Sequence, residues 1–298
     1  MTSTVRASFY VLLAATCAAF SWIFAETLLQ FYGVPLIWAI ILSNVAGGIS
    51  LIAFSIRSSQ PSVWTLSRKQ WRNLIIVSIC LYVASTLGSY YSVLLIGSGK
   101  STLLGLLQSP VVVIFAIVFL SERLQSKHWI AGGFILLGAF LINFNPNAFT
   151  LEIGIGESAR IATTIFVAVG IILMKPIVAQ VNAIQATGVS ILISVIFLLM
   201  ALPLFDVELQ LNVPIFVLLT IVGILRGLSW LLYYIALPVI GVSRGIILFG
   251  SNAFFTVLLQ VAVVAMLPFL GLKLPSNLLM ALLGGVFMLG GIALMNRS

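Results

Sequence analysis

Two charged residues stand inside long apolar segments and are the first candidates for chemistry. Glu26 lies in the segment 7–31 and is the only acidic residue that we place inside such a segment, and Arg226 lies in the segment 213–236. A charge at the centre of a bilayer costs about 2.5–3.5 kcal/mol on translocon scales, so it usually faces a cavity or a partner. Glu26 could carry a proton or pair with a substrate amine, and Arg226 could hold a substrate carboxylate bidentately. The alternatives without a role in substrate binding are an interfacial glutamate that faces water and an arginine that binds backbone carbonyls or snorkels to the inner surface.

Uncharged polar and aromatic residues lie at similar depth in the other apolar segments. Such donors beside aromatic rings suit a moderately polar organic solute, although any single one more often joins two helices. Together with the two charged residues they form the set of candidate substrate-binding residues. The set is Glu26, Asn44, Tyr82, Ser85, Tyr90, Gln108, Arg226, Trp230, Tyr233 and Asn252.

Two apparent motifs carry no chemistry. The stretch from Gly97 to Ser101 resembles the end of a phosphate-binding loop, but Leu94 stands where the first glycine belongs and no strand precedes it. His128, the sole histidine, is predicted on a cytoplasmic rim without metal-binding partners. The apolar segments hold no paired aspartates, no metal-ligand set and no nucleophile with a base, so we expect no enzyme, metal or cofactor.

The composition indicates that a bilayer is the main solvent. Of 298 residues, 62% are hydrophobic and 7% are charged, and the mean hydropathy is +1.26. A helix needs about 20 mostly apolar residues to span a membrane. The predicted transmembrane helices are 7–31, 35–57, 72–95, 100–120, 127–144, 157–178, 183–204, 213–236, 244–267 and 276–295.

The basic residues predict the orientation of these ten helices. If the N-terminus is cytoplasmic, Lys100, Arg160 and Lys273 alone fall on the external side, and Arg226 lies within a helix. The cytoplasmic side then holds Arg6, Arg57, Arg68, Lys69, Arg72, Arg123, Lys127, Lys175, Arg244 and Arg297. This split follows the positive-inside rule and predicts an inner or plasma membrane protein with both termini in the cytoplasm. Because the basic residues are spread over short loops, we expect no nucleic-acid partner.

The predicted depths separate the two charged candidates. At about 1.5 Å per residue, Glu26 lies roughly 28 Å from the cytoplasmic end of the first helix. Arg226 lies roughly 14 Å from the cytoplasmic end of the eighth helix. We therefore expect no direct ion pair between them.

The chain contains an internal repeat. The stretch 90–120 resembles 233–264: each begins with a tyrosine pair and continues with a glycine (Gly97 or Gly241) and a basic residue three positions on. Each then carries an amide within the next apolar segment, Gln108 or Asn252. A triplet of glycines matches as well, Gly132, Gly133 and Gly138 against Gly284, Gly285 and Gly290.

This repeat predicts the fold class and the division into domains. Repeats of five helices enter the membrane from opposite sides because five is odd, which gives an inverted repeat. We expect an all-α integral membrane protein with one five-helix repeat in residues 1–147 and an inverted one in residues 148–298. Two such repeats can rock about a central cavity, as in secondary transporters, although duplication could also have built a bundle without transport.

The pattern resembles the ten-helix drug/metabolite transporter superfamily, in particular its EamA-like members. The most specific stretch runs from Tyr90 through Gln108, Ser109 and Pro110 to the sequence Ser121-Glu122-Arg123-Leu124. The second half departs from the family where Lys273 and Leu274 replace an expected glutamate, and Ser43 and Asn44 stand where many relatives carry an arginine. The resemblance implies solute export or exchange without specifying the solute.

We therefore predict a secondary transporter that exports or exchanges small organic metabolites, such as amino acids or related amphipathic compounds, by alternating access. One alternative is a proton-coupled multidrug cation antiporter, which would favour Glu26 over Arg226 as the binding group. A membrane receptor or scaffold is the alternative from another class. The expected partners are a small-molecule solute and membrane lipid. The oligomeric state stays open, and a monomer is compatible with the sequence.

Overall fold

The computed structural model describes residues 3–56, 60–122, 126–145, 150–151, 153–205, 207–274 and 277–296. Most of these residues are helical, and each predicted transmembrane segment coincides with one or more helices. Three basic residues used for the orientation, Arg57, Arg123 and Arg297, lie outside the described residues, as does the predicted boundary at 147/148.

The helices of the first predicted repeat include two π-helical turns. In the second of these turns, Ser78–Ala84, the chain passes from α3 into α4 without leaving helical geometry. The order is α1 (Ser3–Glu26), η1 (Thr27–Phe31), α2 (Leu36–Ser55), η2 (Val63–Thr65), α3 (Arg68–Val77), η3 (Ser78–Ala84), α4 (Ser85–Leu104), η4 (Gly105–Leu107), α5 (Gln108–Leu120) and α6 (Ser126–Asn143).

The second predicted repeat follows a short antiparallel pairing of β1 (Phe144–Asn145) with β2 (Thr150–Leu151). Its longest helix, α9, runs without a break through 28 residues. The order is α7 (Ile155–Val178), α8 (Ala183–Ala201), η5 (Leu202–Leu204), α9 (Val213–Ile240), α10 (Val242–Phe249), α11 (Ser251–Met266), η6 (Pro268–Leu270) and α12 (Leu278–Asn296).

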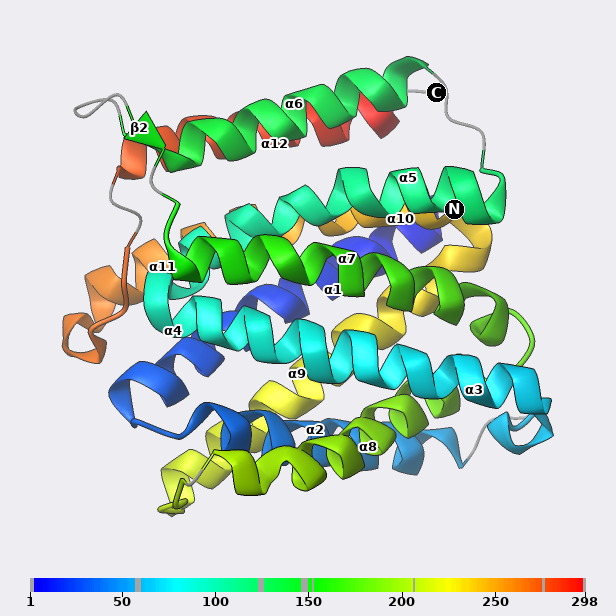
Figure 1. Ribbon diagram of the computed structural model, residues 1–298. Helices are drawn as coiled ribbons and strands as arrows, with labels where there is room; N and C mark the ends of the chain where they lie inside the picture. The colour runs from blue at the N-terminus through cyan, green and yellow to red at the C-terminus, as the bar shows by residue number, and fades with distance from the viewer. Residues whose placement is uncertain are drawn as a thin grey trace.

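Seven helical stretches of the described chain are long and apolar enough to cross a membrane, and α6 and α12 contain shorter apolar runs. One of the seven, Arg68–Leu120, has 53 residues. At 1.5 Å per residue it would be roughly 80 Å long, far more than the roughly 30 Å hydrocarbon core. Figure 1 shows that it turns back on itself, because α4 and α5 run in opposite directions and α7 packs against both.

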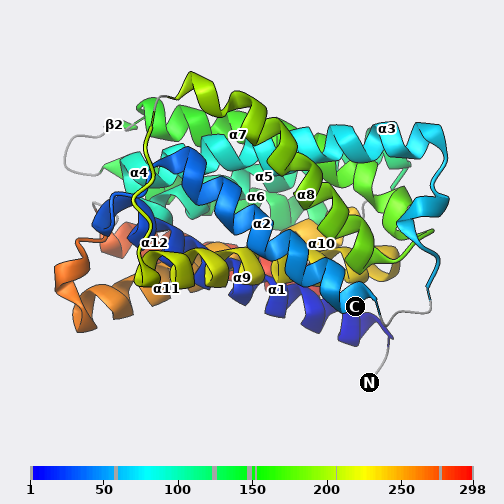
Figure 2. The ribbon, with the colours of Figure 1, turned by 90° about the horizontal axis from the view of Figure 1, so that it is seen from below.

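The chain ends lie at one end of the helix bundle, as both ribbon views show (Figures 1 and 2). We call this end the terminal face; it also carries the end of α5, the start of α6 and the connections from α7 to α8 and α9 to α10. The opposite face carries the connections from α1 to α2, α4 to α5, α8 to α9 and α11 to α12. The pair α6 and α12 forms one edge of the bundle, and the pair α2 and α8 forms the other.

The polarity of the fold is inverted relative to a water-soluble protein. Large apolar side chains cover the outside, among them Phe54 at 74% and Leu204 at 84% exposure. Polar side chains such as Asn44, Gln108 and Asn252 are buried. An exposed apolar surface of this extent is stable only against lipid or another apolar partner. The helices therefore form an integral membrane protein whose interior holds polar side chains beside a hydrophobic core.

Helix breaks near the middle of each repeat occur at glycines with the same backbone conformation. Gly97 interrupts α4 with φ 79° and ψ 162°, and Gly241 separates α9 from α10 with φ 77° and ψ 164°. Only glycine adopts this region without strain. The 3₁₀ turn η4 directly precedes α5, in which Pro110 is the third residue. A proline ring clashes with the carbonyl four residues earlier, so the regular α-helix resumes only after that turn.

Candidate functional site

The interior encloses a cavity of about 50 Å³ between helices of both predicted repeats. A water molecule needs about 10–15 Å³ of such space, so the cavity has room for a few waters. An organic solute could enter only if the helices moved apart. The lining residues are Ala18, Ser21 and Trp22 of α1, Leu81, Ser85, Thr86 and Ser89 of η3 and α4, Gln108 of α5, Arg160 and Val167 of α7, Arg226, Ser229 and Trp230 of α9, Phe249 of α10 and Asn252 of α11.

Arg226 lies halfway along α9 and lines the cavity. Its guanidinium donates one hydrogen bond to the Tyr90 hydroxyl at 3.0 Å and a second, short one to the side-chain oxygen of Asn44. It also lies over the Tyr90 ring, 5.5 Å from the ring centroid. The Asn44 amide is fixed in turn because it donates to the Ser194 hydroxyl at 3.0 Å. These neutral acceptors orient the charge of Arg226 without neutralising it.

Arg160 is the second guanidinium of the cavity. It is 6% exposed and donates to the Ser101 carbonyl at 3.0 Å, to the Ser89 hydroxyl and to Thr163. Its guanidinium carbon lies 5.7 Å from the centroid of the Trp22 ring. As with Arg226, every hydrogen-bond acceptor that the described residues offer to this group is uncharged.

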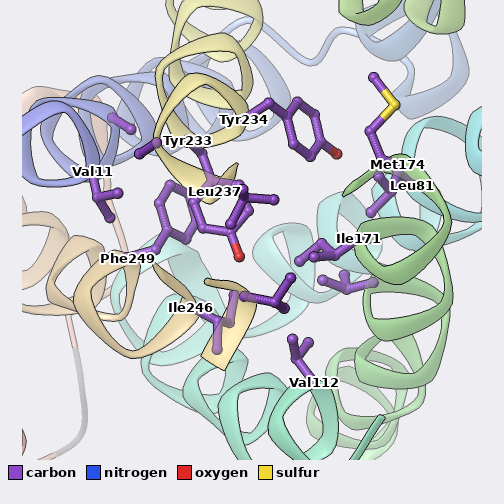
Figure 3. Packing of buried hydrophobic residues seen from close by; sticks show 14 of the residues in the cluster. Val11, Leu81, Val112, Ile171, Met174, Tyr233, Tyr234, Leu237, Ile246 and Phe249 are labelled. Carbon is purple, nitrogen blue, oxygen red and sulfur yellow. The ribbon is translucent and has the colours of Figure 1, made fainter. Parts of the chain in front are cut away.

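A cluster of aromatic rings forms one wall of the cavity towards the terminal face. Trp230 stacks on Phe249 at 5.8 Å and on Tyr234 at 5.6 Å, and its edge contacts Tyr82 and Tyr233. Figure 3 shows Tyr233, Tyr234 and Phe249 packed with aliphatic side chains of the core. The wall is therefore mainly aromatic, and Trp230 and Phe249 are the residues that it contributes to the cavity surface.

Glu26 lies away from the cavity, in a buried cluster near the opposite face. Its carboxylate accepts hydrogen bonds from the backbone N–H of Ser98 at 2.9 Å, from the Gln260 amide at 2.9 Å and from the backbone N–H of Lys273 at 3.0 Å. The ammonium group of Lys273 donates to the carbonyls of Leu94 and Leu95, just before the break at Gly97. Glu26 therefore joins three parts of the chain and is not among the residues that line the cavity.

A second carboxylate cluster lies at the terminal face. Glu122, directly after α5, accepts hydrogen bonds from the backbone N–H groups of Val242 at 2.9 Å and Ser243 at 3.1 Å. The Ser243 hydroxyl and the Lys175 ammonium group both donate to it at 2.7 Å. Burial raises the pKa of Glu122, but these hydrogen bonds outweigh burial and hold the pKa below its ordinary value. Glu122 is thus charged at neutral pH.

The predicted site residues fall into three groups. Ser85, Gln108, Arg226, Trp230 and Asn252 line the cavity. Asn44 and Tyr90 bind Arg226, and Tyr82 and Tyr233 pack against Trp230. Glu26 alone lies elsewhere. Arg226 and Glu26 make no ion pair in the structure, as their predicted depths imply.

The sequence reasoning missed two functional candidates and one buried acid. Arg160 was assigned to the external side of the membrane, and Trp22 was not among the candidate residues, yet both line the cavity. The prediction that Glu26 is the only acidic residue inside a long apolar segment was wrong. Glu157 lies in α7 and pairs with Lys100 at 2.7 Å. The available signal was that Arg160 and Glu157 both fall inside the predicted helix 157–178 and share its first turn.

The comparisons with known proteins agree with this architecture. Residues 5–144 match the EamA-like transporter family, which confirms the predicted resemblance for that part of the chain. One solved crystal structure has a similar fold, with a TM-score of 0.71 and 16% sequence identity over 99% of this chain and 96% of its own. At that identity the likeness concerns the fold alone. No curated protein matches the chain in sequence.

The apolar helices indicate an integral membrane protein, and the family match covers residues 5–144, slightly less than half of the chain. This family consists of transporters and is typically non-enzymatic.

Proposed function

We propose that this protein is a secondary transporter that exports or exchanges small organic metabolites, such as amino acids and related amphipathic compounds. The observation that carries this proposal is the polar cavity of about 50 Å³ at the junction of both repeats, with Arg226 among its lining residues. A guanidinium held by neutral partners remains available to a substrate carboxylate, and the aromatic wall around Trp230 suits the apolar part of the same solute.

The transport cycle that we propose is alternating access between two inverted five-helix repeats. Three features support ten membrane crossings in this arrangement. The Gly97 and Gly241 breaks share one conformation. The packing of α1 against α9 has a counterpart in the packing of α7 against α4. Both chain ends lie at the terminal face. Repeats related in this way exchange two states of comparable energy, open to opposite sides.

The two carboxylate clusters are suited to closing the ends of this pathway. Glu122 connects α5 with α7 and α10 at the terminal face, and Glu26 connects α1 with Gln260 and Lys273 near the opposite face. Both sets of contacts join the first predicted repeat to the second. Opening the terminal face would break the contacts of Glu122 and leave those of Glu26 intact, and opening the opposite face would do the reverse. Each open state would therefore be closed at its other end.

We assign the terminal face to the cytoplasm and the protein to an inner or plasma membrane. The described part of that face contains Arg6, Arg68, Lys69 and Arg72 in the helix ends nearest to it. Lys100 and Lys273 lie near the opposite face. This asymmetry is what the positive-inside rule predicts for cytoplasmic termini.

The geometry favours this proposal over a multidrug cation antiporter. A cation site needs a carboxylate in the cavity, and the described lining contains none. Glu26, the candidate for that role, accepts three hydrogen bonds outside the lining. A receptor or scaffold would have no need of a buried guanidinium held at an internal cavity.

Flux measurements test the proposal directly. Purified protein in liposomes should accumulate radiolabelled amino acids or organic acids when the lumen holds the same unlabelled solute, and should not accumulate tetraphenylphosphonium. Arg226→Gln should reduce flux about tenfold or more, because hydrogen bonds to charged groups contribute about 1.5–3 kcal/mol. Arg72→Gln, which removes an exposed charge from α3, is the matched control. Flux of the cation with no flux of carboxylate solutes would reverse the assignment, and flux of neither would favour the receptor or scaffold.

A further inference from the structure

The cavity contains two guanidinium groups and no carboxylate among its described lining residues. Every acidic residue that the structure describes is placed elsewhere. Glu157 pairs with Lys100, and Glu122 pairs with Lys175, each at 2.7 Å. Glu26 is held by Ser98, Gln260 and Lys273. Glu208 is exposed in the connection between α8 and α9. The described residues therefore leave two positive charges of one cavity without an anionic partner.

The two guanidinium groups are held as parts of one assembly. Arg160 donates to the Ser89 hydroxyl and Arg226 donates to the hydroxyl of the next residue, Tyr90. The Trp22 ring contacts both Arg160 and Tyr90. Its centroid lies 5.7 Å from the guanidinium carbon of Arg160 and 5.8 Å from the centroid of the Tyr90 ring. Tyr90 in turn lies 5.5 Å from the guanidinium carbon of Arg226. A chain of contacts through the Trp22 and Tyr90 rings thus connects the two guanidinium groups.

The fold makes specific room for the Arg160 guanidinium. Gly105, in the turn before α5, faces it so closely that a Cβ atom there would lie 2.0 Å from the Nη2 atom of Arg160. Nη2 itself has no hydrogen-bond partner among the described residues, whereas Nε and Nη1 are both bonded. A donor group with an unused nitrogen at a cavity wall can bind an anionic oxygen directly.

From this arrangement we infer that the transported solute is a small organic dianion with two separate carboxylates, one bound by Arg226 and the other by Arg160. This inference rests on the proposed transport function and names the substrate class of the same site. Separate carboxylates fit better than one compact oxyanion because the two guanidinium groups are held by different partners. Arg160 is bound to Ser89 and Ser101, whereas Arg226 is bound to Tyr90 and Asn44. The aromatic surfaces of Trp22 and Trp230 then border the carbon chain that connects the carboxylates.

Ligand-induced thermal stabilisation of the detergent-purified full chain tests the inference at constant ionic strength. The probes are succinate and glutarate as dicarboxylates, butyrate as a monocarboxylate, glycerol 3-phosphate as a compact dianion and glycine as a zwitterion. We expect the dicarboxylates to bind at least about tenfold more tightly than butyrate, since each charge-assisted pair contributes roughly that factor. Glycerol 3-phosphate and glycine should bind no better than butyrate.

Two variants test whether Arg160 binds the second carboxylate of the solute. Arg160→Gln should bring dicarboxylate affinity down to that of butyrate while butyrate affinity stays within about threefold. Gly105→Ala, which displaces the guanidinium but keeps its charge, should weaken dicarboxylate binding in the same direction. Arg72→Gln on the exposed side of α3 should change neither. If Arg160→Gln fails to fold, the Gly105→Ala variant still decides the question.

The outcomes separate this inference from the transport proposal. If butyrate or glycine binds wild-type protein as tightly as the dicarboxylates do, or if Gly105→Ala leaves dicarboxylate affinity unchanged, the dianion assignment is overturned while transport stands. Preferential binding of glycerol 3-phosphate would overturn it in favour of a single compact oxyanion. If no probe binds, the assignment also falls, and flux of leucine or tryptophan into proteoliposomes then decides whether the protein is a transporter at all.

Discussion

Glu122 and Lys175 form an ion pair of 2.7 Å that joins the end of α5, in the first predicted repeat, to the last turn of α7, in the second. The same carboxylate receives the first two backbone N–H groups of α10, Val242 and Ser243. A negative charge at a helix N-terminus and a positive charge near a helix C-terminus are each favourable, so one pair of side chains stabilises both helix ends.

The depressed pKa of Glu122 predicts how stability depends on pH. A carboxyl group whose pKa is lower in the folded state contributes stability above its ordinary value of 4.5 and loses it as the pH falls through the folded value. The unfolding midpoint of Glu122→Gln should therefore lie a few degrees below that of wild type at pH 7, because about 1 kcal/mol corresponds to roughly 2–4 °C in a chain of this size. The difference should shrink below pH 4.5. Thermal scans of both proteins from pH 7 to pH 3 measure it, and a difference independent of pH would contradict the ion-pair explanation.

Glu26→Gln should slow transport without changing what is transported. The substitution places an amide N–H₂ among three donors that now point at a carboxylate, so the cluster near the opposite face loses favourable contacts. Since Glu26 is not part of the cavity lining, the ratio of anion to cation flux should stay the same while total flux falls about tenfold. Glu208→Gln, at an exposed acid, is the control. A changed ratio of anion to cation flux in Glu26→Gln would instead identify Glu26 as a substrate group.

The two glycines at the helix breaks should differ in their tolerance of alanine. Both have φ near +78°, where a side chain costs roughly 1–3 kcal/mol. A Cβ on Gly97 would also lie 2.6 Å from the carbonyl oxygen of Lys273, whereas a Cβ on Gly241 would meet Glu122 at an ordinary 3.4 Å. Gly97→Ala should therefore lower the unfolding midpoint more than Gly241→Ala. Equal effects would show that backbone strain alone governs both positions.

The crossing of α2 and α9 should be intolerant of any added side-chain atom. A Cβ on Gly47 would lie 2.4 Å from the Gly223 carbonyl oxygen, and a Cβ on Gly223 would lie 2.1 Å from the Ser43 carbonyl oxygen. Backbone atoms cannot move aside as a side chain can, so Gly47→Ala or Gly223→Ala should destabilise the protein by at least about 1–3 kcal/mol. Gly132→Ala, where the described structure places nothing within 4 Å, should be neutral or stabilising by up to about 1 kcal/mol. Chemical or thermal unfolding in detergent measures all three.

Local patterns were sufficient to predict where the helices lie. The predicted segment 183–204 coincides with α8 and η5, and 157–178 differs from α7 by two residues at its start. Hydropathy and length decide such segments residue by residue, whatever the neighbouring helices are. The break glycines were found for a similar reason, because the two stretches around Gly97 and Gly241 resemble each other in sequence.

The candidate site was predictable only in part. Arg226 stood out because it is an isolated charge in the middle of an apolar segment, and the structure places it at the cavity. Arg160 did not stand out because it lies near the start of its helix, where an arginine usually reaches the membrane surface. Glu26 appeared to be a substrate group for the same reason as Arg226, yet the chain surrounds it with hydrogen-bond donors.

The order of amino acids is enough to indicate that the solvent is a bilayer, where the helices lie and which few polar residues must avoid lipid. Which of those residues meet depends on how the helices pack. Ser89 and Tyr90 bind two arginines that come from α7 and α9, and the Glu122 carboxylate reaches helices far away along the chain. The reason is physical: burial in a membrane depends on each segment's own hydropathy, whereas a contact between helices depends on their lateral order and rotation, which the close approach of glycines such as Gly47 and Gly223 sets.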